Sequence, residues 1–176
     1  MAGNSRRSRD AEKDLIDTLI DQWRRERPDL DAKALGVVGR ILMIGRRLEN
    51  RASATLKAFD LHYSDFDVLA TLRRSGAPYE LTPKELMQSV LITSGAMTAL
   101  LDRLSSRNLI TRGQSDHDGR VRTAILTDEG KALIDKAVGA RFEEARDAIA
   151  GLSAERQRGL ANDLREIAFW LDSNEK

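Results

Sequence analysis

The sequence has 176 residues and a formal net charge of +1, from 29 Lys and Arg against 28 Asp and Glu. Hydrophobic residues make up 41% and charged residues 32%, which excludes an intrinsically disordered chain and predicts a globular one of ordinary domain size. There is no cysteine, so disulfides, thiolate metal sites and thiol nucleophiles are excluded. Taken alone, the near-neutral total argues against a nucleic-acid partner, but that inference depends on where the charges lie.

The sequence shows no signal for export and no segment that suggests membrane insertion. The first nine residues are basic and no apolar stretch follows them, so they do not resemble a secretory signal. We predict a disordered basic arm over residues 1–9. No apolar run approaches the roughly 20 residues that span a bilayer, so we expect no membrane partner and a cytoplasmic location.

Two helices are predicted at the start of the chain. Helical periodicity begins at about Asp10 and ends before Pro28, and a longer helix is predicted from about Ala34 to Phe59. The longer helix carries two apolar lines, which predict that it packs on its own core and also on a partner. One line is Leu35, Val38, Leu42, Ala52, Leu56 and Phe59, and the other is Val37, Ile41, Ile44 and Leu48.

Two short helices are predicted next. Ser64 is the expected N-cap of the first, which runs over Asp65–Arg74. The second begins sharply, because Thr82 and Glu85 have the spacing of a capping box around a proline at the first helical position. This helix is predicted to end near Val90.

A third short helix and a hairpin follow. Thr93 or Ser94 is the expected N-cap of this helix, and Asn108 suits its left-handed C-terminal stop. Strand-like stretches over 109–112 and 121–126 are separated by a polar turn, which predicts a β-hairpin. Two further helices close the chain, one beginning after the cap sequence TDEG and one after a second serine cap.

The order of short helix, tight turn, helix and hairpin describes a winged helix-turn-helix, in a mainly α (α+β) fold. The second helix of such a unit enters the major groove by its first turn, which should carry small and polar residues. Ser94, Gly95 and Thr98 occupy that region. A cation at the hairpin tip can reach the adjacent minor groove, and Arg120 and Arg122 lie there. We therefore predict double-stranded DNA as the partner.

Five motifs in this part of the chain carry a more specific resemblance. They are LTPKEL at 81–86, TSGAMT at 93–98, LDRL at 101–104, DHDGR at 116–120 and LTDEG at 126–130. With this spacing the chain resembles the MarR family of bacterial transcriptional regulators over residues 35–173. The resemblance implies a homodimer that binds pseudo-palindromic operators, usually as a repressor, and is released by a small ligand.

The resemblance also implies a domain organisation. Residues 10–176 would form a single MarR-like domain. Residues 10–60 and 130–173 would supply the dimerisation helices, and residues 61–128 the winged helix-turn-helix lobe that binds DNA.

The predicted wing departs from the family pattern. Its tip usually reads Asp-Pro-x-Asp-Arg-Arg, whereas here His117 stands at the proline and Gly119 at the first arginine. Arg120 retains the second arginine and is our first candidate for a minor-groove contact, followed by Arg122. Arg103, in the LDRL motif, is a further DNA-contact candidate, with a salt bridge inside the lobe to the neighbouring Asp102 as the alternative.

The N-terminal extension resembles the urate- and phenolic-responsive, PecS/HucR-like branch of the family. By position that resemblance assigns an effector site to Trp23, Asp67 and Arg112, and a small anionic aromatic compound as the ligand. Leu100 stands where the branch often has an arginine in the recognition helix, so the ligand would differ from urate. The alternatives are packing for the tryptophan, a surface ion pair with Arg73 or Arg74 for the aspartate, and a phosphate contact for the arginine.

Other classes of function find less support in the sequence. The run Asp116-His117-Asp118 lies in one turn and the other histidine, His62, is distant in sequence, so we expect no metal site and no cofactor. No set of acid, base and nucleophile is present, so we expect no enzyme. A winged-helix module that binds protein, and a regulator without a small-molecule effector, remain as alternatives.

The placement of charge agrees with the DNA-binding prediction. Between Leu81 and Leu126 the sequence carries six cations and four anions, which gives this segment a net charge of +2. The excess is small, but it lies on the proposed DNA-binding unit and a dimer doubles it. We therefore expect modest non-specific binding, with operator choice left to shape and base contacts.

Overall fold

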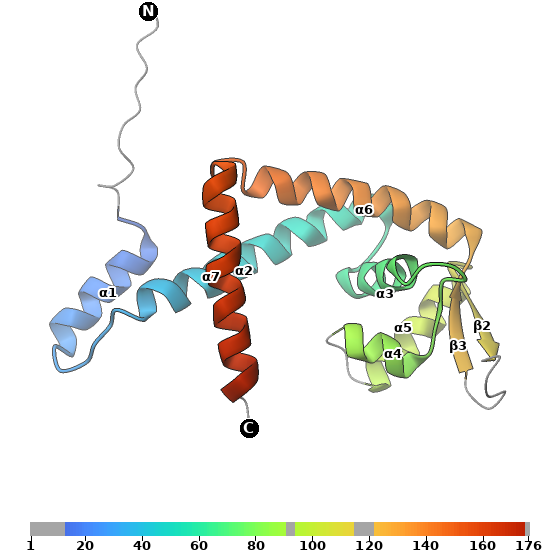
Figure 1. Ribbon diagram of the computed structural model, residues 1–176, viewed down its shortest axis with the longest axis horizontal. Coiled ribbons are helices and arrows are strands. Elements are labelled where there is room, and N and C mark those ends of the chain that lie inside the picture. The colour runs from blue at the N-terminus through green and yellow to red at the C-terminus, as the bar shows by residue number, and fades with distance from the viewer. Residues whose placement is uncertain (1–12, 91–93, 115–121, 175–176) are drawn as a thin grey trace, which may run out of the picture. The chain divides into compact units, whose positions relative to one another are not determined.

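The computed structural model describes residues 13–90, 94–114 and 122–174, with the side chain of Ser94 left out. Helices dominate, and a small antiparallel sheet is formed by strands between residues 80 and 126 (Figure 1), which is the predicted mainly α (α+β) class. The chain divides into two compact units, residues 1–50 and 51–176, and each is described by itself below. The arm predicted over residues 1–9 lies outside the described residues.

The first unit consists of α1 (Leu15–Glu26) and most of α2 (Leu35–Leu56). Asp14 caps α1, and its Oδ1 accepts the N–H of Asp17 at 3.0 Å. Arg40 of α2 pairs with both carboxylates, at 2.9 Å to Asp14 and 2.8 Å to Asp17, so the start of α1 is tied to α2 by charge. The buried apolar residues of this small cluster are Ile16, Ile20 and Ala32.

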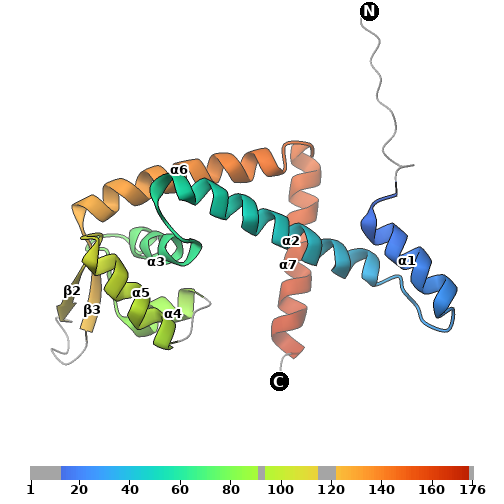
Figure 2. The same cartoon turned by 180° about the vertical axis from the view of Figure 1, so that it is seen from behind.

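The second unit contains a compact lobe of three short helices. They are α3 (Tyr63–Arg74), α4 (Pro83–Ser89) and α5 (Ser94–Ser106), and they lie together beside the sheet in both views (Figure 1, Figure 2). The expected cap of α3 was wrong by two residues. His62 is the N-cap, and its N–H donates to Asp65 Oδ2 at 3.0 Å, so α3 begins before Ser64.

The start of α4 follows the prediction. The Thr82 Oγ1 accepts the N–H of Glu85 at 3.2 Å, and the Glu85 carboxylate accepts the N–H of Thr82 at 2.8 Å. Pro83 occupies the first turn, where its missing N–H costs no hydrogen bond. This reciprocal cap fixes the first helix of the helix-turn-helix.

The sheet has three strands in the order β1-β3-β2. The predicted hairpin is confirmed as β2 (Ile110–Gln114) and β3 (Arg122–Leu126), paired in antiparallel register from Ile110 with Leu126 to Gln114 with Arg122. The sequence did not predict β1 (Glu80–Leu81), which pairs with the other edge of β3. This strand attaches the segment before α4 to the hairpin.

The core of the lobe is formed by aliphatic side chains from α3, α4, α5 and the hairpin, together with the first half of α6 (Asp128–Ala148). Its fully buried members include Leu56, Val68, Leu69, Leu72, Leu86, Met97, Leu101, Leu104, Ile110 and Ile134. A final helix, α7 (Ala154–Asn174), has no buried residue. No helix among the described residues is long and apolar enough to cross a membrane.

Candidate nucleic-acid interface

One face of α5 is available to a partner, and the other is held in the core. Met97, Leu100, Leu101 and Leu104 are buried, whereas Gly95, Ala96, Thr98 and Ala99 are exposed. The exposed residues are small and uncharged, and they lie in the first half of the helix. The face can therefore approach another surface closely, as a recognition helix must in the major groove.

The position of Leu100 bears on the effector prediction. Its side chain is buried in the core of the lobe. An arginine at this position would have to turn out of the core. Leu100, which replaces the arginine of the branch pattern, therefore acts as a packing residue and does not line a binding site.

The wing is held at a fixed register beside α5. Asn108 adopts φ 56° directly after the helix, and the N–H of Leu109 donates to the Leu104 carbonyl at 3.0 Å, so β2 begins immediately. Arg122 opens β3 with an exposed side chain opposite Gln114. Arg120 lies outside the described residues. Within the described residues, the exposed cation at the turn end of the hairpin is thus Arg122.

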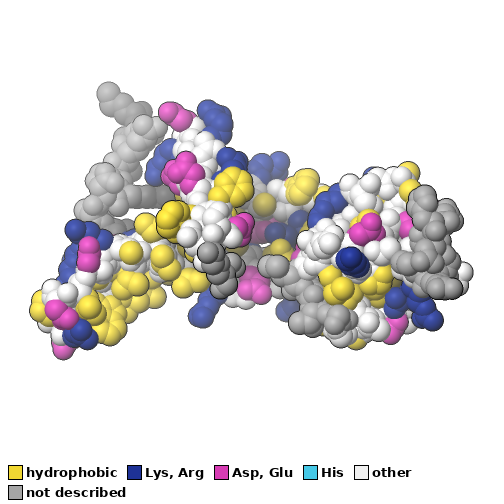
Figure 3. Space-filling model, turned by 60° about the horizontal axis from the view of Figure 1, so that its bottom comes forward, with side chains coloured by type: hydrophobic (Ala, Val, Ile, Leu, Met, Phe, Trp, Pro, Cys, Tyr) yellow, Lys and Arg dark blue, Asp and Glu magenta, His cyan; other side chains and the backbone are white. Residues whose placement is uncertain are grey.

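The surface of the lobe carries separated charges rather than a dense cationic patch. Figure 3 shows Lys and Arg side chains scattered among neutral and hydrophobic ones over this lobe, with several residues of uncertain placement in grey. Lys84 is exposed on α4 and Arg122 on β3. This distribution agrees with the small local charge calculated from the sequence.

Arg103 has a partner inside the lobe. Its Nη2 lies 2.5 Å and its Nε 3.1 Å from Oδ1 of Asp65, which is fully buried on α3. The neighbouring Asp102 instead pairs with Arg112 of β2, at 2.5 Å. The predicted salt bridge of Arg103 inside the lobe is therefore present, but its partner is Asp65 and not Asp102. Arg103 and Asp65 are 38 residues apart, so no local sequence pattern links them.

The three predicted effector residues lie on three different elements. Trp23 is on α1 with 51% of its surface exposed, Asp67 is on α3, and Arg112 is on β2. Burial raises the pKa of the Asp67 carboxyl above its usual value, and the charge of Arg74 partly opposes that shift. Among the described residues no ion pair joins Asp67 to Arg112. Arg73 pairs with Asp135 at 2.7 Å and is therefore not the partner of Asp67.

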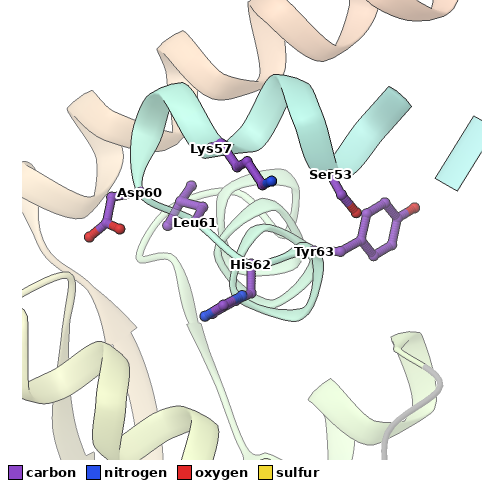
Figure 4. Close-up of a pocket in the computed structure, with 6 residues that line it drawn as sticks. All are labelled: Ser53, Lys57, Asp60, Leu61, His62 and Tyr63. Atoms are coloured by element: carbon purple, nitrogen blue, oxygen red, sulfur yellow. The ribbon is translucent and has the colours of Figure 1, made fainter. Parts of the chain in front are cut away.

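The lobe also contains a shallow pocket where α2 meets α3, with a volume of about 180 Å³. Figure 4 shows Ser53 near the end of α2, Lys57 in the 3-10 turn that follows it (η2, Lys57–Phe59), and His62 and Tyr63 at the start of α3, with the ring of Tyr63 next to Ser53. No sequence motif pointed to these residues. No group of metal-ligating side chains occurs in the described part of the chain.

These features define a class of protein. A capped short helix, a second helix with a small neutral face, and a hairpin with a basic strand end make up a winged helix-turn-helix, the architecture of a DNA-binding lobe. A family model described as MarR family matches residues 59–121. The chain is 34% identical to the HTH-type transcriptional regulator PecS of Dickeya dadantii over 159 residues, which cover 90% of this chain and 96% of PecS. The protein belongs to the MarR family of transcriptional regulators.

Solved structures agree with this fold. Sco3205 of Streptomyces coelicolor in complex with DNA is similar at a TM-score of 0.72 and 24% identity, covering 83% of this chain and 92% of that one. A mutant of Escherichia coli MarR complexed with operator DNA gives a TM-score of 0.66 at 22% identity, covering 88% and 99%. BpsR of Bordetella bronchiseptica, whose DNA binding is regulated by 6-hydroxynicotinic acid, gives 0.66 at 20% identity, covering 75% and 92%.

Proposed function

We propose that this transcriptional regulator binds a pseudo-palindromic operator as a homodimer, acts as a repressor, and releases DNA when a small anionic aromatic compound binds. The observation that carries the DNA-binding part is the exposed, uncharged first half of α5, supported from below by buried leucines. In this proposal Ser94, Gly95 and Thr98 approach the base edges, and Arg120 and Arg122 reach the minor groove.

The intergenic DNA beside the protein's own gene is the first target to test. We expect tight binding to a palindromic segment there, and an affinity that falls steeply as salt rises, because cations on the protein displace counterions from the phosphates. A random duplex of equal length should bind more weakly by roughly a thousandfold or more. Binding that is absent, or flat with salt on both duplexes, would instead support a winged-helix module that recognises protein.

The arginine at the effector position supports a release mechanism. Arg112 neutralises Asp102, which lies on the exposed side of α5, through a 2.5 Å contact. A bound carboxylate would compete for the guanidinium and leave the Asp102 charge unpaired on the helix that faces DNA. Asp67 with its raised pKa would sense the same anion, and the exposed ring of Trp23 would supply an aromatic surface.

Urate and 6-hydroxynicotinic acid are suitable probes of this mechanism. Each is added to the protein–DNA complex, and the DNA affinity is measured for the wild type and for Trp23→Ala and Arg112→Ala. With 6-hydroxynicotinic acid a coupling of roughly 1–3 kcal/mol, equal to about a 5- to 150-fold loss of affinity, is expected in the wild type and is expected to disappear in both variants. Urate should release less DNA, because Leu100 replaces the arginine of the branch pattern. Release that persists in both variants would remove these residues from the effector site, and no release with either probe would favour a regulator without a small-molecule effector.

A further inference from the structure

Two arginines tie the C-terminal end of α5 to the start of α3 and to the connection before it. Arg103 is in α5, and Arg107 directly follows that helix. Arg103 pairs with the buried Asp65 at the start of α3. Arg107 donates from Nη1 to the Asp60 carbonyl at 2.7 Å, and its Nη2 lies 3.2 Å from Asp60 Oδ2. We propose that Arg103 and Arg107 are positioning residues, which set the rotation and depth of the recognition helix, and that Arg103 does not contact DNA. This inference rests on the proposed DNA-binding function.

The burial of Asp65 explains why Arg103 has to remain paired with it. Asp65 has no exposed surface, and its two oxygens are both used: Oδ1 accepts two N–H groups of Arg103, and Oδ2 accepts the His62 N–H at 3.0 Å. A buried carboxylate that loses its cationic partner is strongly destabilising. If the guanidinium of Arg103 turned toward a phosphate, it would strand this charge in the core of the lobe.

The spacing of the two arginines explains what they control. They are four residues apart, so they lie on one side of the helix about 6 Å from each other along its axis. Their partners lie close together in the sequence: Asp60, held at φ 52°, is in the connection between α2 and α3, and Asp65 is in the first turn of α3. One tie alone would leave the helix able to pivot, whereas two ties on one side fix which residues face outward. The outward residues are then Gly95, Thr98 and their neighbours.

The test compares Arg103→Lys, Arg103→Gln, Asp65→Asn and the double variant Asp65→Asn/Arg103→Gln in the full-length chain. The probe is the intergenic duplex bound by the wild type, at four salt concentrations. Positioning predicts that each single variant loses affinity by about tenfold or more, and that the double variant loses little more than the worse single one. It also predicts an unchanged slope of log affinity against log salt, because no phosphate contact has been removed.

Arg122→Gln is the matched control, since it removes one exposed arginine from the wing of the same lobe. Its slope should fall by about 1.8, because each of the two protomers of the dimer loses one DNA-contacting cation and each lost cation accounts for about 0.9. If Arg103→Gln also lowers the slope by this amount, or if Arg103→Lys retains wild-type affinity while Asp65→Asn has no effect, Arg103 is a DNA contact and the inference is wrong. Lysine separates these cases because it can neutralise a phosphate but cannot direct two donors at Asp65 Oδ1.

Amide hydrogen exchange of the DNA-free protein tests the inference without a DNA-affinity measurement, which would be hard to interpret for a variant that folds poorly. Positioning predicts faster exchange in α5 for Arg103→Lys and for Arg107→Lys before any DNA is added, with the core strand β3 unchanged. Unaltered exchange in α5 would contradict it. A wild type that binds no duplex at all would overturn the DNA-binding proposal itself, whereas the exchange result would still report on the two ties.

Discussion

Asp67 carries a charge at an unfavourable position on α3. Burial raises the pKa of its carboxyl, and the charge of Arg74 only partly counteracts this. A carboxyl whose pKa is raised by folding binds its proton more tightly in the folded state. It therefore lowers stability once the pH exceeds the folded-state pKa, and this cost disappears as the pH falls through that value toward 3.8.

Asp67→Asn should consequently stabilise the protein at pH 7. We expect Tm to rise by roughly 1–3 °C relative to wild type, and the difference to shrink as the pH is lowered to about 4. Thermal unfolding at a series of pH values measures this directly. An equal or lower Tm for the variant at pH 7 would show that the carboxylate has a stabilising partner in solution.

Gly130 occupies a position with no room for a side chain. A Cβ at this position would lie 2.0 Å from the backbone carbonyl oxygen of Leu109, which cannot move without disturbing the start of the hairpin. Gly130→Ala should therefore destabilise the protein by about 3 kcal/mol or more and lower Tm by roughly 6 °C or more.

Gly139 lies on the same helix and provides the matched control. A Cβ there meets nothing within 4 Å in this chain, so Gly139→Ala should stabilise α6 by about 0.5–1 kcal/mol through helix propensity alone. Urea unfolding of both variants separates the two effects. Similar losses for both would mean that the contact with Leu109 is not what restricts position 130.

At the scale of elements, the capping box of α4 shows how local sequence fixes the helix-turn-helix. The backbone N–H and hydroxyl of Thr82 both hydrogen bond to the Glu85 carboxylate, and these bonds lower the pKa of that carboxyl. Thr82→Ala should cost about 1 kcal/mol, or roughly 2–4 °C in Tm. Because the folded-state pKa of Glu85 lies below 4.5, its share of the stability is present above that pH and is lost as the pH falls through the lowered value.

Measurement of Tm for Thr82→Ala at pH 7 and pH 3 tests this account. The loss relative to wild type should be larger at pH 7, where the carboxylate is ionised and accepts from Thr82. A loss that does not depend on pH would mean that the threonine acts through packing rather than through the cap.

Elements with strong local signals were predictable from the sequence. The cap at Thr82, the left-handed stop at Asn108 and the two runs of the hairpin all act within a few residues, and each lies where it was expected. The two-residue strand at 80–81 was not predictable, because its only pairing is with β3, more than 40 residues later. The start of α3 was misplaced because a serine outranks a histidine in capping preference, whereas here Asp65 supports the histidine cap.

The same contrast between local and tertiary features applies to the candidate site. The small residues at the start of α5 could be identified from the sequence because they are neighbours in the chain, and their role in DNA contact stays a prediction. The ties from Arg103 to Asp65 and from Arg107 to Asp60 were not recognisable, since they join elements through burial and tertiary distance. A buried aspartate among apolar neighbours in the sequence DFDVLATL gives no indication of which cation will reach it.

At the scale of the whole molecule, the amount of exposed apolar surface calls for a partner. Seven exposed apolar residues of the first unit lie on the two apolar lines of α2, and Figure 3 shows hydrophobic side chains gathered along this part of the chain. They are Leu35, Val37, Val38, Ile41, Leu42, Ile44 and Leu48. The described part of α7 likewise buries none of its residues. Surfaces of this kind mark interaction sites, and a second copy of the chain is the partner that our proposed function requires.

Leu42→Glu places a charge in the middle of this apolar line, on a side chain that is 65% exposed in the single chain. Burial of an unpaired carboxylate between two copies is strongly unfavourable, so the variant should elute as a 19.7 kDa monomer where the wild type elutes at twice that mass. Affinity for the palindromic duplex should fall by roughly a hundredfold or more, because the two half-sites are no longer bound by one particle. Lys33→Glu changes the charge at an equally accessible position outside the line and should leave the mass unchanged. Light scattering with size-exclusion chromatography distinguishes the outcomes, and a Leu42→Glu protein that remains dimeric would place the interface on other surfaces.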